Sequence, residues 1–314
     1  MLQQIAAGNR VVNLDKLTYA ANQKHLASVE NHENYHFILG DICDAALVKQ
    51  IFTENKPDFV VNFAAESHVD NSILSPHEFI KTNIEGVFTM LQAAREYWQN
   101  LKGKAHENFR FLHVSTDEVF GSLEFTATKF SEDSRYEPSS PYSASKAASD
   151  HLVRAWNRTY GLPTIITNCS NNFGPRQHIE KLIPKIIRNC LNEKKIPIYG
   201  DGTNIRDWIW VEDHCRGIAL ALEKGEPSET YLFGGDCEKN NLEIVTIICE
   251  LMDEIHPRKN GAKHIELIEF VVDRAGHDLR YAVSNEKSQH KLGFEPTPDF
   301  NANLRKTIKF YMTH

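Results

Sequence analysis

The chain has 314 residues, enough for one large or two ordinary domains, because a single hydrophobic core usually stops growing at roughly 250–300 residues. With 41% hydrophobic and 25% charged residues, its composition is average for a soluble globular protein, and no apolar run approaches the roughly 20 residues of a bilayer span. The net charge of −7 provides no basic field for a phosphate backbone, so we expect neither a nucleic-acid partner nor a membrane.

The predicted elements follow an alternating order along the chain. Leu2 to Gly8 looks like the end of a helix. Short runs rich in Val, Ile and Phe then alternate with amphipathic segments, which is the pattern of a parallel sheet covered by helices. Strands are expected at residues 10–15, 35–39, 59–63, 109–115 and 163–168, and helices at 44–55, 77–98 and 140–160. This predicts a doubly wound, Rossmann-type α/β fold.

The alternation of predicted strands and helices becomes irregular after about residue 170. Loops such as 199–202 and 274–278 interrupt the helices there, which suits a ligand-binding lobe. We therefore expect a dinucleotide-binding domain at residues 1–170, with later segments returning to it, and a smaller substrate-binding lobe at 171–314.

The termini and the cysteines favour a cytoplasmic protein. Residues 1–5 lack the basic region and apolar core of a signal peptide. The six cysteines are scattered without the spacing of a metal site, so we expect free thiols and no bound metal. They are Cys43, Cys169, Cys190, Cys215, Cys237 and Cys249.

Tyr142 and Lys146 lie four residues apart at the start of the helix predicted for 140–160, so their side chains share one face. A free tyrosine has a pKa near 10, but an ammonium one turn away can stabilise the phenolate and make it a base. Such a base could take a hydroxyl proton as hydride leaves the same carbon. Taken alone, the spacing also occurs by chance on solvated helices.

The strand predicted for 109–115 runs into Thr116, Asp117 and Glu118. Open α/β sheets bind their ligands at the carboxyl ends of strands, where these residues would lie. Two adjacent carboxylates can serve as acid and base if burial and mutual repulsion separate their protonation states. The simpler alternative is a helix cap or turn with one solvated acid. Beside a redox tyrosine, paired acids suggest elimination of water.

Several segments of the sequence resemble those of the extended short-chain dehydrogenase/reductase superfamily, and within it the dTDP-glucose 4,6-dehydratases. The resemblance runs from about Arg10 to the end of the chain. It is carried by residues 13–20, 40–42, 64–70, 115–121, 142–146, 170–175 and 273–281.

The resemblance implies a mechanism for converting dTDP-glucose to dTDP-4-keto-6-deoxyglucose. Tyr142 would take the proton of the C4 hydroxyl as hydride passes to NAD, while Lys146 holds the tyrosine and the ribose and Thr116 contacts the C4 oxygen. Glu118 would then remove the C5 proton and Asp117 would protonate the departing C6 hydroxyl. The hydride finally returns to C6.

The resemblance also implies contacts with NAD. Asp15 would bind the adenosine ribose, and an acid at this place favours NAD because it repels a ribose phosphate; taken alone, Asp15 fits a turn aspartate equally well. Asn171 would flank the nicotinamide. The full set is Asp15, Lys16, Leu17, Thr18, Ala20, Asp41, Ile42, Ala64, Ala65, Thr82, Tyr142, Lys146 and Asn171.

For the nucleotide sugar, Arg206 and Arg274 would offer planar donor forks to the diphosphate, although a single arginine is more often just solvated. Tyr199 would pack on the base or belong to a core. Besides Glu118, the substrate set is Ser67, Thr116, Asn171, Lys181, Leu182, Pro197, Ile198, Tyr199, Arg206, Asn241, Asp273, Arg274, His277 and Tyr281.

One departure from the family pattern concerns the cofactor. The family begins with a strand and a glycine-rich GxxGxxG turn ahead of the segment equivalent to residues 11–15, and the sequence has neither before Arg10. Because that turn binds the pyrophosphate, we expect weak NAD binding, little turnover and two unpaired sheet edges.

Alternatives keep the fold but change the function. They are a nucleotide-sugar epimerase or decarboxylase, against which the paired acids argue, and an impaired chain that binds sugar nucleotides without catalysis. The helices at 77–98 and 140–160 carry enough apolar surface to pair with a second copy, as the family's dimers do, so a homodimer is expected.

Overall fold

The computed structural model describes residues 1–273 and 276–313, and these form two compact units. Unit 1 comprises residues 1–114 and 140–166, and unit 2 comprises residues 115–139 and 167–314. Segment 115–139 thus groups with the second half of the chain. The predicted division of ligand-binding roles at residue 170 stays a prediction.

The helices and strands of unit 1 match the predicted order, and β4 and β5 continue from it into unit 2. The elements are α1 (Leu2–Ala6), β1 (Val11–Asp15), η1 (Gln23–Leu26), β2 (Tyr35–Leu39), α2 (Ala45–Asn55), β3 (Phe59–Asn62), α3 (Val69–Leu74), α4 (Pro76–Ile80), η2 (Lys81–Gly86), α5 (Val87–Asn100), α6 (Lys104–Asn108), β4 (Arg110–Thr116), α7 (Pro141–Tyr160) and β5 (Thr164–Cys169).

Capping residues fix the ends of the long helices in unit 1. The Asp44 side chain accepts hydrogen bonds from two amides in the first turn of α2. Ser140 forms a capping box with Ser143 ahead of α7, Pro141 takes the first helical position, and Gly161 ends the helix with a positive φ of 75°. The segment predicted as one helix at 77–98 consists of α4, the π-helical turn η2 and α5.

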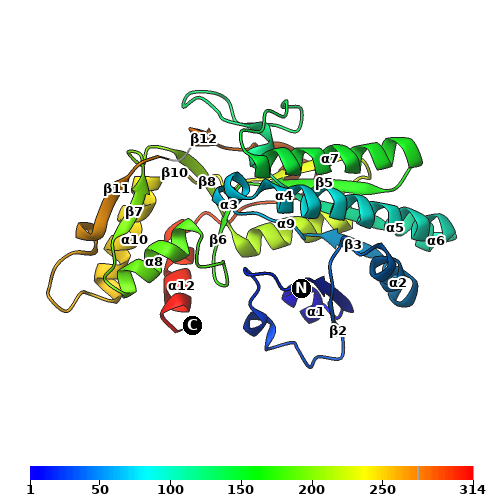
Figure 1. The fold of residues 1–314 in the computed structure, drawn as a ribbon, viewed down its shortest axis with the longest axis horizontal. Coiled ribbons are helices and arrows are strands. Elements are labelled where there is room, and N and C mark those ends of the chain that lie inside the picture. The colour runs from blue at the N-terminus through cyan, green and yellow to red at the C-terminus, as the bar shows by residue number, and fades with distance from the viewer. Residues whose placement is uncertain (274–275, 314) are drawn as a thin grey trace. The chain divides into compact units, whose positions relative to one another are not determined.

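Two parallel ladders contribute to unit 1. β1 pairs with β2, and β3 pairs with β4 so that Asn62 lies opposite His113. β1 and β2 form a two-stranded sheet, whereas β3 and β4 belong to a four-stranded sheet of order β3-β4-β5-β9. The apolar core lies where α5 packs against α2 and α7 (Figure 1).

Unit 2 has more irregular strands, as the sequence predicted. Its elements are η3 (Asp117–Phe120), β6 (Asn171–Phe173), α8 (Leu182–Leu191), β7 (Ile196–Tyr199), β8 (Ile205–Trp210), α9 (Val211–Lys224), β9 (Thr230–Phe233), β10 (Glu238–Asn240), α10 (Asn241–Ile255), η4 (His264–Leu267), β11 (Ile268–Val271), β12 (Arg280–Tyr281), α11 (Glu286–Leu292) and α12 (Phe300–Thr313).

Strand β8 is the central strand of a sheet in unit 2. It pairs with β10 in antiparallel and with β6 and β12 in parallel, while β11 pairs in parallel with β7. Helices α8, α10 and α12 pack together over a second apolar core that includes Ile183, Ile248 and Leu304 (Figure 1).

All six cysteines are free thiols, as predicted. None of the described helices is both long and apolar enough to cross a bilayer.

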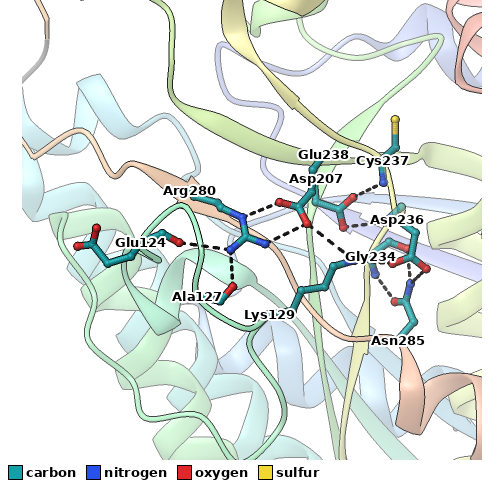
Figure 2. Close-up of polar contacts among 11 residues, drawn as sticks. Glu124, Ala127, Lys129, Asp207, Gly234, Asp236, Cys237, Glu238, Arg280 and Asn285 are labelled. Carbon is teal, nitrogen blue, oxygen red and sulfur yellow. Dashed lines mark hydrogen bonds and ion pairs between the residues drawn. The ribbon is translucent and has the colours of Figure 1, made fainter.

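A partly buried ionic network attaches segment 122–136 to the strands of unit 2 (Figure 2). The Arg280 guanidinium donates to both carboxylate oxygens of Glu238 at 2.6 and 3.1 Å, and to the Ala127 carbonyl at 2.7 Å. Lys129 pairs with Asp236 at 2.7 Å. Buried Asp207 accepts from the Gly235 and Cys237 amides, and burial raises its pKa.

Replacing Arg280 by methionine should lower the free energy of unfolding by about 3 kcal/mol, because it leaves Glu238 and two carbonyls without their donor. The control is Arg305→Met, which removes the exposed pair of Arg305 with Glu254 and should change stability by less than about 0.5 kcal/mol. Urea unfolding followed by circular dichroism measures both. Equal effects of the two substitutions would show that the network does not hold the segment.

Candidate active site

The carboxyl ends of β1 and β2 bring charged residues together in unit 1. The Asp15 carboxylate ends β1 and accepts from the Leu17 amide at 2.8 Å. Lys16 and Asp41 form an ion pair at 2.8 Å. Burial alone would raise the pKa of Asp41, but the hydrogen bonds from Lys16 and from the Cys43 amide outweigh it and lower the pKa. Five residues of the predicted cofactor set, Asp15, Lys16, Leu17, Asp41 and Ile42, therefore lie at adjacent strand ends.

The loop after β3 carries Ala64 and Ala65 and is fixed by a buried asparagine. Asn83, fully buried in the π-helical turn η2, accepts from the Glu66 amide at 2.9 Å and donates to the Glu66 carbonyl at 3.0 Å. It also donates to the Ser145 hydroxyl on α7 at 2.8 Å. The π-helical turn, which contains predicted Thr82, is the kind of helix irregularity found often at functional sites.

Tyr142 and Lys146 share one buried face in the first turns of α7, as predicted. The Tyr142 ring packs edge-on against Phe79 with centroids 6.3 Å apart. The Lys146 ammonium donates to the Val114 carbonyl of β4 at 2.8 Å. This bond holds the lysine against the sheet, so Lys146 is not a solvated surface lysine.

Thr116 ends β4, and Asp117 and Glu118 follow it, so all three lie at the carboxyl end of the strand as expected, in unit 2. The Thr116 hydroxyl accepts from the Glu118 amide at 3.3 Å, which caps the short helix η3. Asp117 is 2% exposed, and its Oδ2 has no hydrogen-bond partner among the described residues. Burial, followed by the charges of Glu118 and Asp207, raises the pKa of Asp117 well above its usual range. Asp117 therefore holds its proton to a higher pH than an ordinary aspartic acid.

Arg206 and Tyr281 lie opposite each other on β8 and β12 in the same unit. The Arg206 guanidinium stacks over the Tyr281 ring at 4.3 Å and donates to the Asp278 carbonyl at 3.0 Å. Burial, and then the negative charge of Glu118, raises the pKa of Tyr281. Glu118 therefore belongs to the same electrostatic environment as the predicted substrate residues Arg206 and Tyr281.

Tyr199 and His277 form a second aromatic group in unit 2. Their rings meet edge-on with centroids 6.5 Å apart, and the His277 imidazole contacts the Asp273 carboxylate at 2.6 Å. Tyr199 ends β7, where it is half-buried. This partial exposure argues against a buried core tyrosine, and the packing of Tyr199 on the base stays a prediction.

The other predicted residues lie at element ends and in loops. Thr18 and Ala20 lie after β1, Ser67 after β3, and Asn171 begins β6. Lys181 precedes α8 and Leu182 begins it, Pro197 and Ile198 belong to β7, and Asn241 begins α10. Arg274 lies outside the described residues, so its predicted role is not placed. Most of the predicted cofactor set belongs to unit 1 and, apart from Ser67, the predicted substrate set to unit 2.

Sequence reasoning missed the supporting polar residues of unit 1. Asn83, His113 and Ser145 are fully buried or nearly so, and each contacts a loop or residue of the candidate site. The available signal was a polar side chain at a core-facing place in an otherwise apolar segment, for example His113 among Phe111, Leu112 and Val114.

The fold and the tyrosine–lysine pair define the chain as a Rossmann-type protein of the short-chain dehydrogenase/reductase class. The family model for GDP-mannose 4,6 dehydratase matches residues 1–307. A dTDP-glucose 4,6-dehydratase of Neisseria meningitidis serogroup B is 54% identical over 304 residues, covering 96% of this chain and 86% of the relative. The dTDP-glucose 4,6-dehydratase 1 of Escherichia coli K12 is 51% identical over 97% of this chain and 86% of its own length.

A solved structure agrees with these relatives. The crystal structure of DesIV, a dTDP-glucose 4,6-dehydratase from Streptomyces venezuelae with NAD and dTDP bound, superposes with a TM-score of 0.88. It is 41% identical, and the match covers 99% of this chain and 92% of that one. The chain belongs to the dTDP-glucose 4,6-dehydratase family.

Proposed function

We propose that this chain dehydrates dTDP-glucose, or a close nucleotide sugar, to the 4-keto-6-deoxy product, with NAD as its cofactor. The observation that carries the proposal is the pair of acids after β4, one of them buried with a raised pKa, in a family member that also has the tyrosine–lysine pair on α7. Epimerisation and decarboxylation need no such acid and base. The relatives and the solved structure support the same reaction.

The described residues fit NAD. Asp15 ends β1 with a carboxylate where an adenosine ribose would bind, and Asn171 presents a buried side-chain oxygen without a hydrogen-bond partner among the described residues. Bound NAD would accept a hydride from C4 and later return it to C6. The remaining proposed NAD contacts are those predicted from the sequence.

The side chains of the site would carry the proton transfers. Tyr142 takes the proton of the C4 hydroxyl, and the fixed Lys146 ammonium favours its phenolate. Thr116 contacts the C4 oxygen. The resulting 4-keto group acidifies C5, from which Glu118 takes a proton. Asp117 gives its proton to the departing C6 hydroxyl, for which its raised pKa prepares it.

Isotope transfer tests the proposed function. With dTDP-glucose deuterated at C4 and NAD present, the product should carry that deuterium at C6, and a reaction in heavy water should place solvent deuterium at C5. Mass spectrometry and NMR locate the labels. Formation of an epimer that keeps the C6 hydroxyl, or binding of dTDP without any reaction, would contradict dehydration.

Ligand-dependent stability separates the enzyme from an impaired binding chain. The enzyme should be stabilised against heat by dTDP and by NAD, whereas a binding chain without catalysis should respond to dTDP alone. Differential scanning fluorimetry with each ligand separately measures this.

We propose a homodimer formed through α5 and α7. Their surface carries aromatic side chains in contact with one another: half-exposed Phe88 meets Trp156 edge-on at 5.8 Å, Trp156 meets Tyr160 at 5.6 Å, and Arg95 lies over Tyr160 at 3.9 Å. An exposed apolar surface of this kind is typical of an association site.

We also propose a cytoplasmic location, because six free thiols suit a reducing compartment.

Replacing Phe88 by glutamate should shift the dimer towards monomer, raising the dissociation constant by at least about tenfold, because it places a charge in an apolar contact. The control is Phe125→Glu, a phenylalanine of similar exposure in unit 2. Sedimentation velocity measures both. A monomeric wild type, or equal dissociation in both variants, would reject this interface.

A further inference from the structure

A fully buried asparagine lies beside the turn that carries the two acids in unit 2. Asn168 belongs to β5 and has no exposed surface. Its side-chain Nδ2 donates to the backbone carbonyl of Thr116, the last residue of β4, at 2.9 Å. The next residue, Cys169, contacts the Ser115 carbonyl through its Sγ at 3.7 Å. Two successive side chains at the end of β5 therefore contact two successive carbonyls at the end of β4.

The orientation of the Asn168 amide follows from this contact. A carbonyl oxygen can only accept a hydrogen bond, so the group that faces the Thr116 carbonyl is the amide NH₂ and not the amide oxygen. A buried amide costs free energy unless it is hydrogen-bonded. An apolar side chain would be the ordinary occupant of this place, because the first five residues of β5 are all buried. The amide is useful there through the groups that it binds.

Thr116 begins the turn that holds the acids. Its hydroxyl accepts from the Glu118 amide and donates to Asp117 Oδ1, each at 3.3 Å. The Thr116 carbonyl and the Asp117 nitrogen belong to one planar peptide group, so a bond that holds this carbonyl also holds the backbone of Asp117. Asn168 thus fixes the start of the turn through the backbone, while the Thr116 hydroxyl fixes the next two residues.

We propose that Asn168 is a positioning residue whose amide holds the Thr116 carbonyl and thereby keeps the two acids of the turn aligned for the loss of water. This inference rests on the proposed function. Asn168 acts through the peptide group between Thr116 and Asp117. A misplacement of about 1 Å in a catalytic group can cost about 10²-fold in rate. Tyr142 lies on α7 and not on this turn, so oxidation at C4 depends on Asn168 less than dehydration does.

The test measures the two steps separately in Asn168→Leu. Leucine branches at the same atom as asparagine and has nearly its size, but it cannot donate a hydrogen bond. Rapid-quench mass spectrometry follows a single turnover of dTDP-glucose with saturating NAD. It distinguishes the substrate, the 4-keto sugar that still has its C6 hydroxyl, and the 4-keto-6-deoxy product. The absorbance at 340 nm reports reduced nicotinamide in the same reaction.

In Asn168→Leu the rate of dehydration should fall about 10²-fold, whereas the rate of oxidation at C4 should fall by no more than about tenfold. The 4-keto sugar and reduced nicotinamide should therefore accumulate. The matched control is Asn157→Leu, which removes an asparagine bond to the Leu162 carbonyl at 2.8 Å near the far end of α7. A loss of folded protein slows both steps in proportion, so this control should accumulate neither species.

Dehydration that is slowed no more than oxidation in Asn168→Leu would overturn the proposal. If Asn168→Leu does not fold, Asn168→Ala removes the same donor without the bulk of leucine, and the ratio of the two rates decides in the same way. Failure of the proposed function looks different, because the wild-type chain itself would then form neither the 4-keto sugar nor the deoxy product from dTDP-glucose.

Discussion

Replacing Glu118 by glutamine is expected to lower kcat for the 4-keto-6-deoxy product by about 10³-fold, within the usual contribution of a general base. The amide cannot take the C5 proton, but it keeps nearly the size and shape of the carboxyl. Oxidation at C4 does not need this base, so reduced nicotinamide should accumulate and absorb at 340 nm. Exchange of the C5 proton with heavy water should stop.

Glu124→Gln is the control for this substitution. Glu124 is an exposed acid in the same unit, and it contacts the Arg280 guanidinium through its backbone carbonyl, which the change leaves intact. The kcat of Glu124→Gln should match the wild-type value. If Glu118→Gln retained both product formation and C5 exchange, the assignment of the base would be wrong.

The fold was predictable where local chemistry agrees with the hydrophobic pattern. The strand at Tyr35–Leu39 was placed to the residue, and α7 begins where Ser140 and Pro141 predict it. Local signals could not show that residues 115–139 group with the second half of the chain. That grouping depends on contacts such as those of Arg280 with Glu124 and Ala127, which are more than 150 residues apart in sequence.

Part of the candidate site could be predicted from the spacing of residues along the sequence. Tyr142 and Lys146 lie four positions apart, so a helix places both on one face, and β4 ends at Thr116, one residue beyond the predicted end of the strand. The raised pKa of Asp117 could not be read from the sequence, because it depends on burial and on Asp207, 90 residues later. The polar contacts of Asn83 and His113 likewise depend on tertiary packing.

Replacing Tyr142 by phenylalanine should lower kcat by about 10³–10⁴-fold, because the C4 hydroxyl then has no base within the site. Unlike Glu118→Gln, this variant should form no reduced nicotinamide. It should also show no exchange at C5, because the C5 proton becomes acidic only after C4 is a ketone. The control is Tyr160→Phe at the exposed end of the same helix, which keeps the ring over which Arg95 lies and should retain full activity.

The order of the two steps makes the pair of variants more decisive than either alone. If oxidation at C4 precedes proton removal at C5, the double variant Tyr142→Phe with Glu118→Gln should behave like Tyr142→Phe, with no absorbance at 340 nm and no deuterium at C5. Independent steps would instead give multiplied losses. Exchange at C5 in Tyr142→Phe would show that Glu118 acts without prior oxidation, and the proposed sequence of oxidation, dehydration and reduction would have to be abandoned.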